Sequence, residues 1–143
     1  MHNATAQGKL ALAQAYRKTT YAADIAGVTY AIRIGRLHRK LDAQLEVLRS
    51  TRWAFVTAWN PQSQRLSARV NRQRHALLTQ ALDERRIRWH PMHATGDAGD
   101  WPTEEGVMAL GLSRTAARRL GKEFEQAAVV FGRVGEKAEL VWT

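Results

Sequence analysis

The chain has 143 residues, of which 22 are Lys or Arg, 13 are Asp or Glu and none is Cys, giving a formal net charge of +9. The absence of cysteine excludes disulfides, thiolate metal sites and cysteine nucleophiles. No apolar run approaches the ~18–20 residues of a membrane span, and the first residues do not resemble a secretory signal. We therefore expect a single domain over residues 1–143, located in the cytoplasm and not attached to a membrane.

The first third of the chain predicts a helix, a β-hairpin and a second helix. Residues 4–16 are expected to form a short helix, and residues 1–15 to be loosely attached to the rest of the domain. The β-rich runs 21–25 and 28–34 surround a two-residue turn that contains glycine, which indicates a hairpin. The helical spacing of the next leucines predicts an amphipathic helix, with its apolar stripe at Leu37, Leu41, Leu45 and Leu48.

The rest of the chain alternates apolar strands with helices. Residues 53–59 and 107–112 are apolar on both alternating faces, as in buried strands. Residues 66–86 predict a long helix, whose apolar stripe is expected at Leu66, Val70, Leu77 and Ala81. Most of residues 90–105 should be loop, because the segment contains two prolines and two glycines.

Near the C-terminus, Ser113 is the expected N-cap of a helix that continues to Phe124. Residues 127–131 and 138–142 then form a second hairpin. The complete order is (α)ββαβαβαββ, with hairpins at both ends. This pattern predicts the α+β class, with helices packed on a mixed β-sheet.

Polar residues surround the predicted junction between strand 53–59 and the following helix. Strand ends that lead into a helix N-terminus are common ligand sites in α/β proteins. The candidate ligand-binding residues there, together with the tryptophan of a later acidic loop, are Asn60, Ser63, Ser67, Asn71, Arg74 and Trp101. The alternative is structural: Asn60 and Ser63 cap a turn and a helix, and Arg74 lies along the boundary of the core.

Positive charge is concentrated in residues 33–88, which carry thirteen basic and four acidic side chains, a balance of +9. Rows of arginine beside a tryptophan can grip a phosphate backbone and stack a base. The candidate nucleic-acid-binding residues are Arg65, Arg69, Arg72, Arg85, Arg86 and Arg88. The alternative is an ordinary solvated helix face, and no recognised nucleic-acid-binding motif accompanies the arginines.

The acidic loop before strand 107–112 offers two candidate catalytic groups, Asp100 and Glu104, either of which could act as a general acid or base. In the same region His90, His93, Asp97 and Asp100 have the types of side chain that bind metals. A loop rich in glycine and proline is a poor fixed scaffold, so we assign no metal site and expect no cofactor.

Three functions remain open from these residues. The first is a binding module for RNA or another polyanion through the arginine rows. The second is a small enzyme or sensor for a nucleotide or phosphorylated ligand at the pocket of Asn60, Asn71 and Arg74. The third is an interaction module whose basic surface meets an acidic protein.

The chain also resembles a bacterial family, domain of unknown function 3293, from about residue 16 to residue 142. The resemblance is carried by the runs at 16–21, 57–63, 99–102, 110–113 and 138–142, together with Leu66, Ser67, Asn71 and Glu104. It implies a stand-alone bacterial cytoplasmic domain and no particular activity. It also draws attention to Asn60, Ser63, Asn71, Asp100, Trp101 and Glu104.

Overall fold

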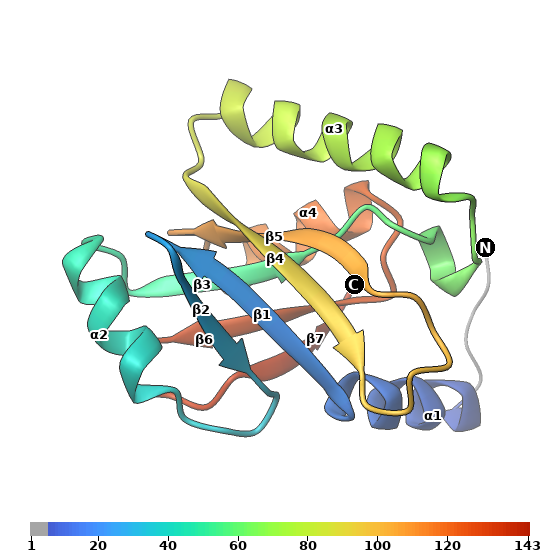
Figure 1. Ribbon diagram of the computed structural model, residues 1–143, viewed down its shortest axis with the longest axis horizontal. Coiled ribbons are helices and arrows are strands. Elements are labelled where there is room, and N and C mark those ends of the chain that lie inside the picture. The colour runs from blue at the N-terminus through green and yellow to red at the C-terminus, as the bar shows by residue number, and fades with distance from the viewer. Residues whose placement is uncertain (1–5) are drawn as a thin grey trace.

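The structure is a computed structural model that describes residues 6–143 (Figure 1). Its elements in chain order are α1 (Ala6–Arg17), β1 (Thr19–Ile25), β2 (Val28–Ile32), α2 (Arg39–Val47), β3 (Arg52–Val56), a 3-10 turn η1 (Pro61–Ser63), α3 (Ala68–Glu84), β4 (Trp89–Gly96), β5 (Glu104–Leu110), α4 (Arg114–Glu123), β6 (Ala128–Arg133) and β7 (Glu139–Trp142). The α+β class, the element order and both terminal hairpins are confirmed, with one strand more than expected. The first two residues of the predicted helix 4–16 lie outside the described residues.

The strands form one seven-stranded sheet in the order β2-β1-β4-β5-β3-β6-β7. The first hairpin turns at Ala26 and Gly27, whose φ angles of 51° and 79° are those of a two-residue turn that matches the twist of the strands. The sheet is curled, so that β1 and β2 lie across β3 and β6 in the view of Figure 1. Side chains from these two parts of the sheet meet in one core, because Tyr21, Ile25 and Ile32 belong to the same buried cluster as Trp53 and Val130.

The additional strand is β4, in the segment that the sequence predicted to be mostly loop. Its backbone pairs with β1 on one side and with β5 on the other. Pro91 and Gly96 argued against a strand, but pairing on both sides outweighs these local preferences. The strand also explains why every pairing in the sheet is antiparallel rather than mixed. It reverses the chain once more between β3 and β5, which would otherwise form a parallel unit around α3.

Helices cover the two faces of the sheet differently. Leu41 and Leu45 of α2 pack into the core on the concave face, whereas α3 and α4 cover the convex face through Leu78, Leu82 and Leu120. The helix α1 lies at one end of the curled sheet (Figure 1) and has no fully buried residue. None of the helices in the described part of the chain is long and apolar enough to cross a membrane.

The buried face of α3 is not the stripe that the sequence predicted. Val70 is 41% exposed and Leu77 is 60% exposed, while Asn71, Leu78 and Leu82 are buried. Apolar residues lie on two different faces of α3, one with Val70 and Leu77 and the other with Leu78 and Leu82. Asn71 lies on the second face, and its hydrogen bonds hold that face against the sheet. The phase of this helix therefore depends on a polar side chain.

Candidate functional site

A cleft of about 520 Å³ opens where α1 meets the ends of β1, β3, β4, β5 and β6. The mouth of a curled or closed sheet is a common place for small-molecule sites. Apolar and aromatic groups contribute much of its wall, including Leu12 and Tyr16 of α1, Tyr21 of β1 and Phe55 of β3. The polar groups include Thr57, Asn60, Ser63, Asp100, Glu104 and Gln126.

Glu104, the first residue of β5, holds the central carboxylate of this cleft. Its Oε1 accepts hydrogen bonds from Asn60 Nδ2 at 2.7 Å and from Trp101 Nε1 at 3.1 Å. Among the described residues, no hydrogen bond reaches the other oxygen, Oε2. Burial raises the pKa of Glu104, and the two hydrogen bonds oppose that rise only in part. The cleft thus contains a fixed carboxyl group with one oxygen available to a ligand.

Asn60 is itself fixed by a reciprocal pair with Asn71 of α3. The backbone N–H of Asn60 donates to Asn71 Oδ1 at 2.9 Å, and Asn71 Nδ2 donates to Asn60 Oδ1 at the same distance. Asn60 Oδ1 also accepts from the backbone N–H of Leu66. Because these bonds occupy Asn60 Oδ1, they orient its Nδ2 group toward Glu104. Asn60 has left-handed backbone angles (φ 47°, ψ 63°), which asparagine tolerates better than most residues.

The turn η1 after Asn60 carries further backbone strain beside the cleft. Gln62 and Ser63 also have positive φ values, of 53° and 60°. The backbone and side-chain amides of Gln62 both donate to the carbonyl oxygen of Glu125, which holds the turn against the start of β6. Non-glycine residues in this conformation cost free energy and concentrate at functional sites.

Tyr16 and Tyr21 complete the site from the N-terminal side. Burial and the neighbouring charge of Glu104 raise the pKa of Tyr16 to about 12. Burial likewise raises the pKa of Tyr21, whose hydroxyl donates to the Tyr16 carbonyl oxygen at 3.4 Å. Both phenols are therefore neutral near pH 7. The Tyr21 O–H is used by the Tyr16 carbonyl oxygen, whereas no hydrogen bond among the described residues uses the Tyr16 hydroxyl.

The sequence did not single out Tyr16, Tyr21, Thr57 or Gln126 as site residues from their chemistry. As possible site residues, Tyr16, Tyr21 and Thr57 stood only in runs that resemble the family, and no local pattern marks Gln126. Its side-chain amide donates to the carbonyl oxygens of Trp59 and Phe124, so it joins the strand exit to the start of β6. Only the curl of the sheet brings these residues to Glu104.

The structure places the predicted ligand-binding residues in three different settings. Asn60, Ser63 and Trp101 line the cleft, as do the two catalytic candidates Asp100 and Glu104. Asn71 is buried behind Asn60, and Ser67 is the N-cap of α3, with its hydroxyl oxygen accepting from Val70 N at 3.2 Å.

Arg74 does not line the cleft, contrary to the expected pocket. Its Nε donates to the Ala58 carbonyl oxygen at 2.6 Å, and a terminal nitrogen donates to the Phe124 carbonyl oxygen at 2.9 Å. A further terminal nitrogen lies 3.7 Å from the Glu125 carboxylate. These contacts use the guanidinium to tie α3 to the strand exit and to the end of α4, so its role here is structural.

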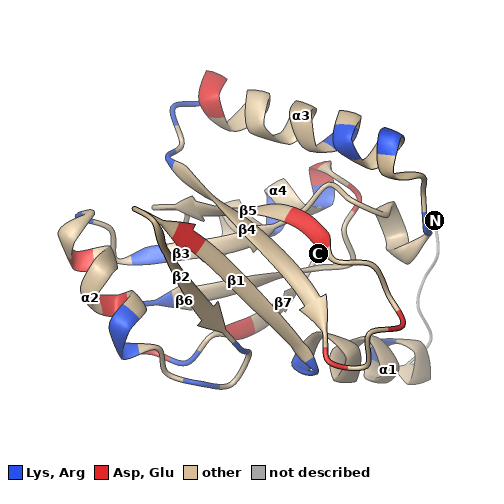
Figure 2. Ribbon diagram, viewed as in Figure 1, with Lys and Arg blue, Asp and Glu red and all other residues tan. Residues whose placement is uncertain are grey.

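The six candidate arginines form two separate groups at the ends of α3 (Figure 2). Because a helix rises about 1.5 Å per residue, the ends of this 17-residue helix are about 25 Å apart. At the N-terminal end, Arg69 and Arg72 are exposed, and Arg65 lies over the Trp101 ring with 5.8 Å between Cζ and the ring centroid. At the other end Arg85 is bidentate to Glu123, Arg88 donates to the Leu48 carbonyl oxygen, and Arg86 follows the helix with φ 55°.

The candidate metal ligands do not converge. His90 and His93 lie three positions apart on β4, so they point to opposite faces of the sheet. Among the described residues no group of three His, Asp or Glu side chains has the geometry to hold a metal ion. Asp97 instead makes a bidentate contact with Arg33, and this guanidinium lowers the pKa of the Asp97 carboxyl.

The fold and the cleft define a small α+β domain with a ligand-sized site at the mouth of a curled antiparallel sheet. A family model described as protein of unknown function (DUF3293) matches residues 56–129, slightly more than half of the chain. The chain belongs to this family. The matched segment contains Asn60, Asn71, Trp101, Glu104 and Gln126, whereas α1 and its Tyr16 precede it. No match was found among curated proteins or among solved structures.

Proposed function

We propose that the cleft binds a small organic molecule, neutral or positively charged, through a hydrogen bond to Glu104. The observation that carries this proposal is the carboxyl group itself, which is partly buried, fixed by Asn60 and Trp101 and open at Oε2. Protein sites for small molecules combine a mostly apolar wall with a few fixed polar groups. Tyr16, Tyr21 and Phe55 supply such a wall.

The charges of the cleft favour this ligand class over the phosphorylated ligand suggested by the sequence. Three carboxylates and one basic residue, Lys18, line the cleft. Asp97 is paired with Arg33, and Asp100 and Glu104 have no ion-pair partner among the described residues. The guanidinium of Arg74, which would have contacted a phosphate, is bonded elsewhere. A phosphate next to Glu104 would meet repulsion, whereas an ammonium or a neutral donor would be stabilised.

The same carboxyl group is the best candidate for proton transfer in the cleft. A general acid or base works best when its pKa lies near the working pH, and burial moves Glu104 in that direction. Asp100 is exposed at the rim, so it is the weaker of the two catalytic candidates.

Three small probes of similar shape test the proposed binding: benzylamine, benzyl alcohol and benzoate. The indole N–H of Trp101 and the Asn60 side-chain amide both donate to Glu104, so their NMR signals report on ligands there. We expect benzylamine and benzyl alcohol to shift these signals and benzoate to leave them unchanged. The Glu104→Gln variant should bind benzylamine about tenfold or more weakly, because it loses a hydrogen bond to a charged group.

Glu105→Gln is the matched control, because Glu105 follows directly on β5 and faces His75 of α3 instead of the cleft. The Glu105→Gln variant should bind benzylamine as the wild type does. Equal shifts with benzoate, or an equal loss in both variants, would refute a role of Glu104 in recognition.

We also propose a second function, an interaction with an acidic protein through the outer surface of α3. The supporting observation is the pairing of exposed Val70 and Leu77 with exposed Arg69 and Arg72 on one helix. An apolar patch beside cations is typical of protein interfaces. The RNA-binding interpretation, favoured by the sequence, receives less support because its six arginines are divided and three of them contact other parts of the chain.

A photo-crosslinking amino acid in place of the exposed Gln73 tests this surface. The same amino acid in place of the exposed Glu46 on α2 is the control. We expect position 73 to capture a defined acidic protein, and Leu77→Asp and Arg69→Glu/Arg72→Glu each to abolish that capture. Capture of RNA with strong salt dependence would instead support the polyanion function. Identical crosslinked products from positions 73 and 46 would show that α3 has no specific interaction surface.

A further inference from the structure

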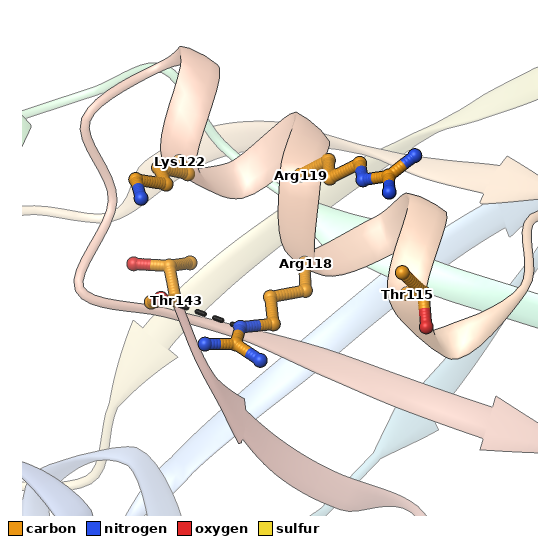
Figure 3. A pocket seen from close by; sticks show the side chains of 5 residues that line it. All are labelled: Thr115, Arg118, Arg119, Lys122 and Thr143. Atoms are coloured by element: carbon orange, nitrogen blue, oxygen red, sulfur yellow. Dashed lines mark hydrogen bonds between the residues drawn. The ribbon is translucent and has the colours of Figure 1, made fainter.

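A second hollow, of about 270 Å³, lies on the outer surface of α4 (Figure 3). It is lined by Thr115, Arg118, Arg119, Lys122 and Thr143, none of which belongs to the cleft around Glu104. No pattern in the sequence singled out these residues. Their side chains are basic or hydroxylic, and no carboxylate side chain is among them.

The backbone that carries these side chains is rigidly placed. Ser113 caps the start of α4, and Ala117, Leu120 and Gly121 are buried against the sheet. At Gly121 the helix approaches β6 so closely that a Cβ atom there would lie 2.4 Å from Val129 Cγ1 and 3.0 Å from Thr143 Cγ2. The backbone positions from which the outer side chains of α4 extend are therefore fixed relative to Thr143.

The carboxylates near the hollow are already bonded to other arginines. Glu123, at the end of α4, is bidentate to Arg85, and Glu139 of β7 accepts from Arg114 Nε at 2.7 Å. Within residues 6–143, no ion pair involves Arg118, Arg119 or Lys122. Three positive charges thus lie within about one helical turn of each other, and among the described residues no acidic side chain is paired with them.

Arg118 is oriented for a ligand by Thr143. Figure 3 shows the Arg118 side chain turned toward Thr143, where Nε donates to the carbonyl oxygen at 3.4 Å. This bond leaves the two terminal nitrogens of the guanidinium free. A planar guanidinium with two free nitrogens, an ammonium and hydroxyl groups are the donors that proteins use for phosphoryl oxygens.

We propose that the outer surface of α4 is a binding site for a phosphoryl group, held by Arg118, Arg119 and Lys122. The site is independent of the cleft, and its charge is opposite to that of the cleft. The phosphoryl group can come from a free phosphorylated molecule or from the backbone of a nucleic acid.

Inorganic pyrophosphate is the first probe, titrated calorimetrically into the full chain at low salt. Arg118→Ala/Lys122→Ala should weaken its binding about tenfold or more, because each substitution removes a charge-assisted hydrogen bond. Both residues are exposed on α4, and a circular dichroism spectrum checks that the variant is folded. The matched control is Arg39→Ala/Lys40→Ala on α2, which removes the same charge from another exposed surface and should keep wild-type affinity.

Equal weakening in the two double variants would show attraction to net charge alone and overturn the proposal, as would the absence of pyrophosphate binding to the wild type. Once the site is established, single-stranded RNA distinguishes the two sources of the phosphoryl group. RNA that binds and is displaced by pyrophosphate assigns the site to a phosphodiester backbone. Failure of RNA to compete assigns it to a free phosphorylated molecule.

Discussion

At the scale of single residues, opposing effects meet on the Glu104 carboxyl group. Burial disfavours its charged form, and the hydrogen bonds from Asn60 and Trp101 favour it. Burial is the larger effect, so the folded protein binds the Glu104 proton more tightly than the unfolded chain does. Asn71 matters indirectly, because without it the amide of Asn60 would not be fixed toward the carboxylate.

The sign of this shift predicts how stability depends on pH. The folded state retains the Glu104 proton above the ordinary glutamate pKa, so the contribution of Glu104 to stability is fully present in acid and is lost as pH rises through its raised pKa. Glu104→Gln removes this dependence while keeping a side-chain oxygen as acceptor. We expect the stability of the variant, relative to the wild type, to increase between about pH 4 and about pH 7. Urea unfolding at both pH values measures it, and an unchanged or decreasing difference would contradict the raised pKa.

At the scale of elements, α3 shows how one polar contact sets the orientation of a helix. The stripe of Val70, Leu77 and Ala81 is as apolar as the face that contains Leu78 and Leu82. Asn71 bonds to Asn60 and can do so only when the second face is turned to the sheet. Arg74 follows Asn71 by three residues on the same side of α3. It supports the same helix orientation by donating hydrogen bonds to two backbone carbonyl oxygens.

Two adjacent leucines test this orientation. Leu78 is fully buried, so Leu78→Ala should lower the free energy of unfolding by about 3 kcal/mol through lost burial and a cavity. Leu77 is 60% exposed, so Leu77→Ala should change it by no more than about 0.5 kcal/mol. Chemical denaturation of both variants makes the comparison. A larger loss at Leu77 would restore the orientation predicted from the sequence.

At the scale of the whole molecule, the curl of the sheet creates the mouth in which the cleft lies, and α1 closes one side of it (Figure 1). The strand β3, which pairs with β5 and β6, is buried along four of its five residues, but α1 has no fully buried residue. Stability is therefore unevenly distributed, with the least burial in the element that borders the site.

Amide hydrogen exchange should reveal this distribution. We expect α1 to exchange by local opening, much faster than α4, a helix of similar length with three buried residues. A ligand that binds in the cleft should slow exchange in α1 and leave α4 unchanged. Equal protection of the two helices in the free protein would show that α1 is as firmly packed as the core helices.

Much of the fold could be predicted from the sequence because its signals are local. Local signals include the β-rich run of residues 21–25, the apolar run of residues 107–112, the leucine spacing of α2 and the Ser113 cap. Each acts within a few residues of the chain. They were sufficient for the α+β class, the order of elements and both hairpins. They failed at β4, where partners on both sides stabilise a strand that its own Pro91 and Gly96 disfavour.

The candidate site was predictable only in part, for the same reason. Asn60, Ser63, Asp100, Trp101 and Glu104 stood out by residue type and position, and all of them line the cleft. Tyr16, Tyr21 and Gln126 reach it from distant parts of the chain, and Arg74 leaves it because backbone carbonyl groups elsewhere bind its guanidinium. By itself the sequence determined the class, the order of elements and the polar residues that follow β3, since these depend on neighbours along the chain. Only the tertiary structure decided the phase of α3, the separation of the arginines and the acidic character of the cleft, since these depend on which distant residues meet.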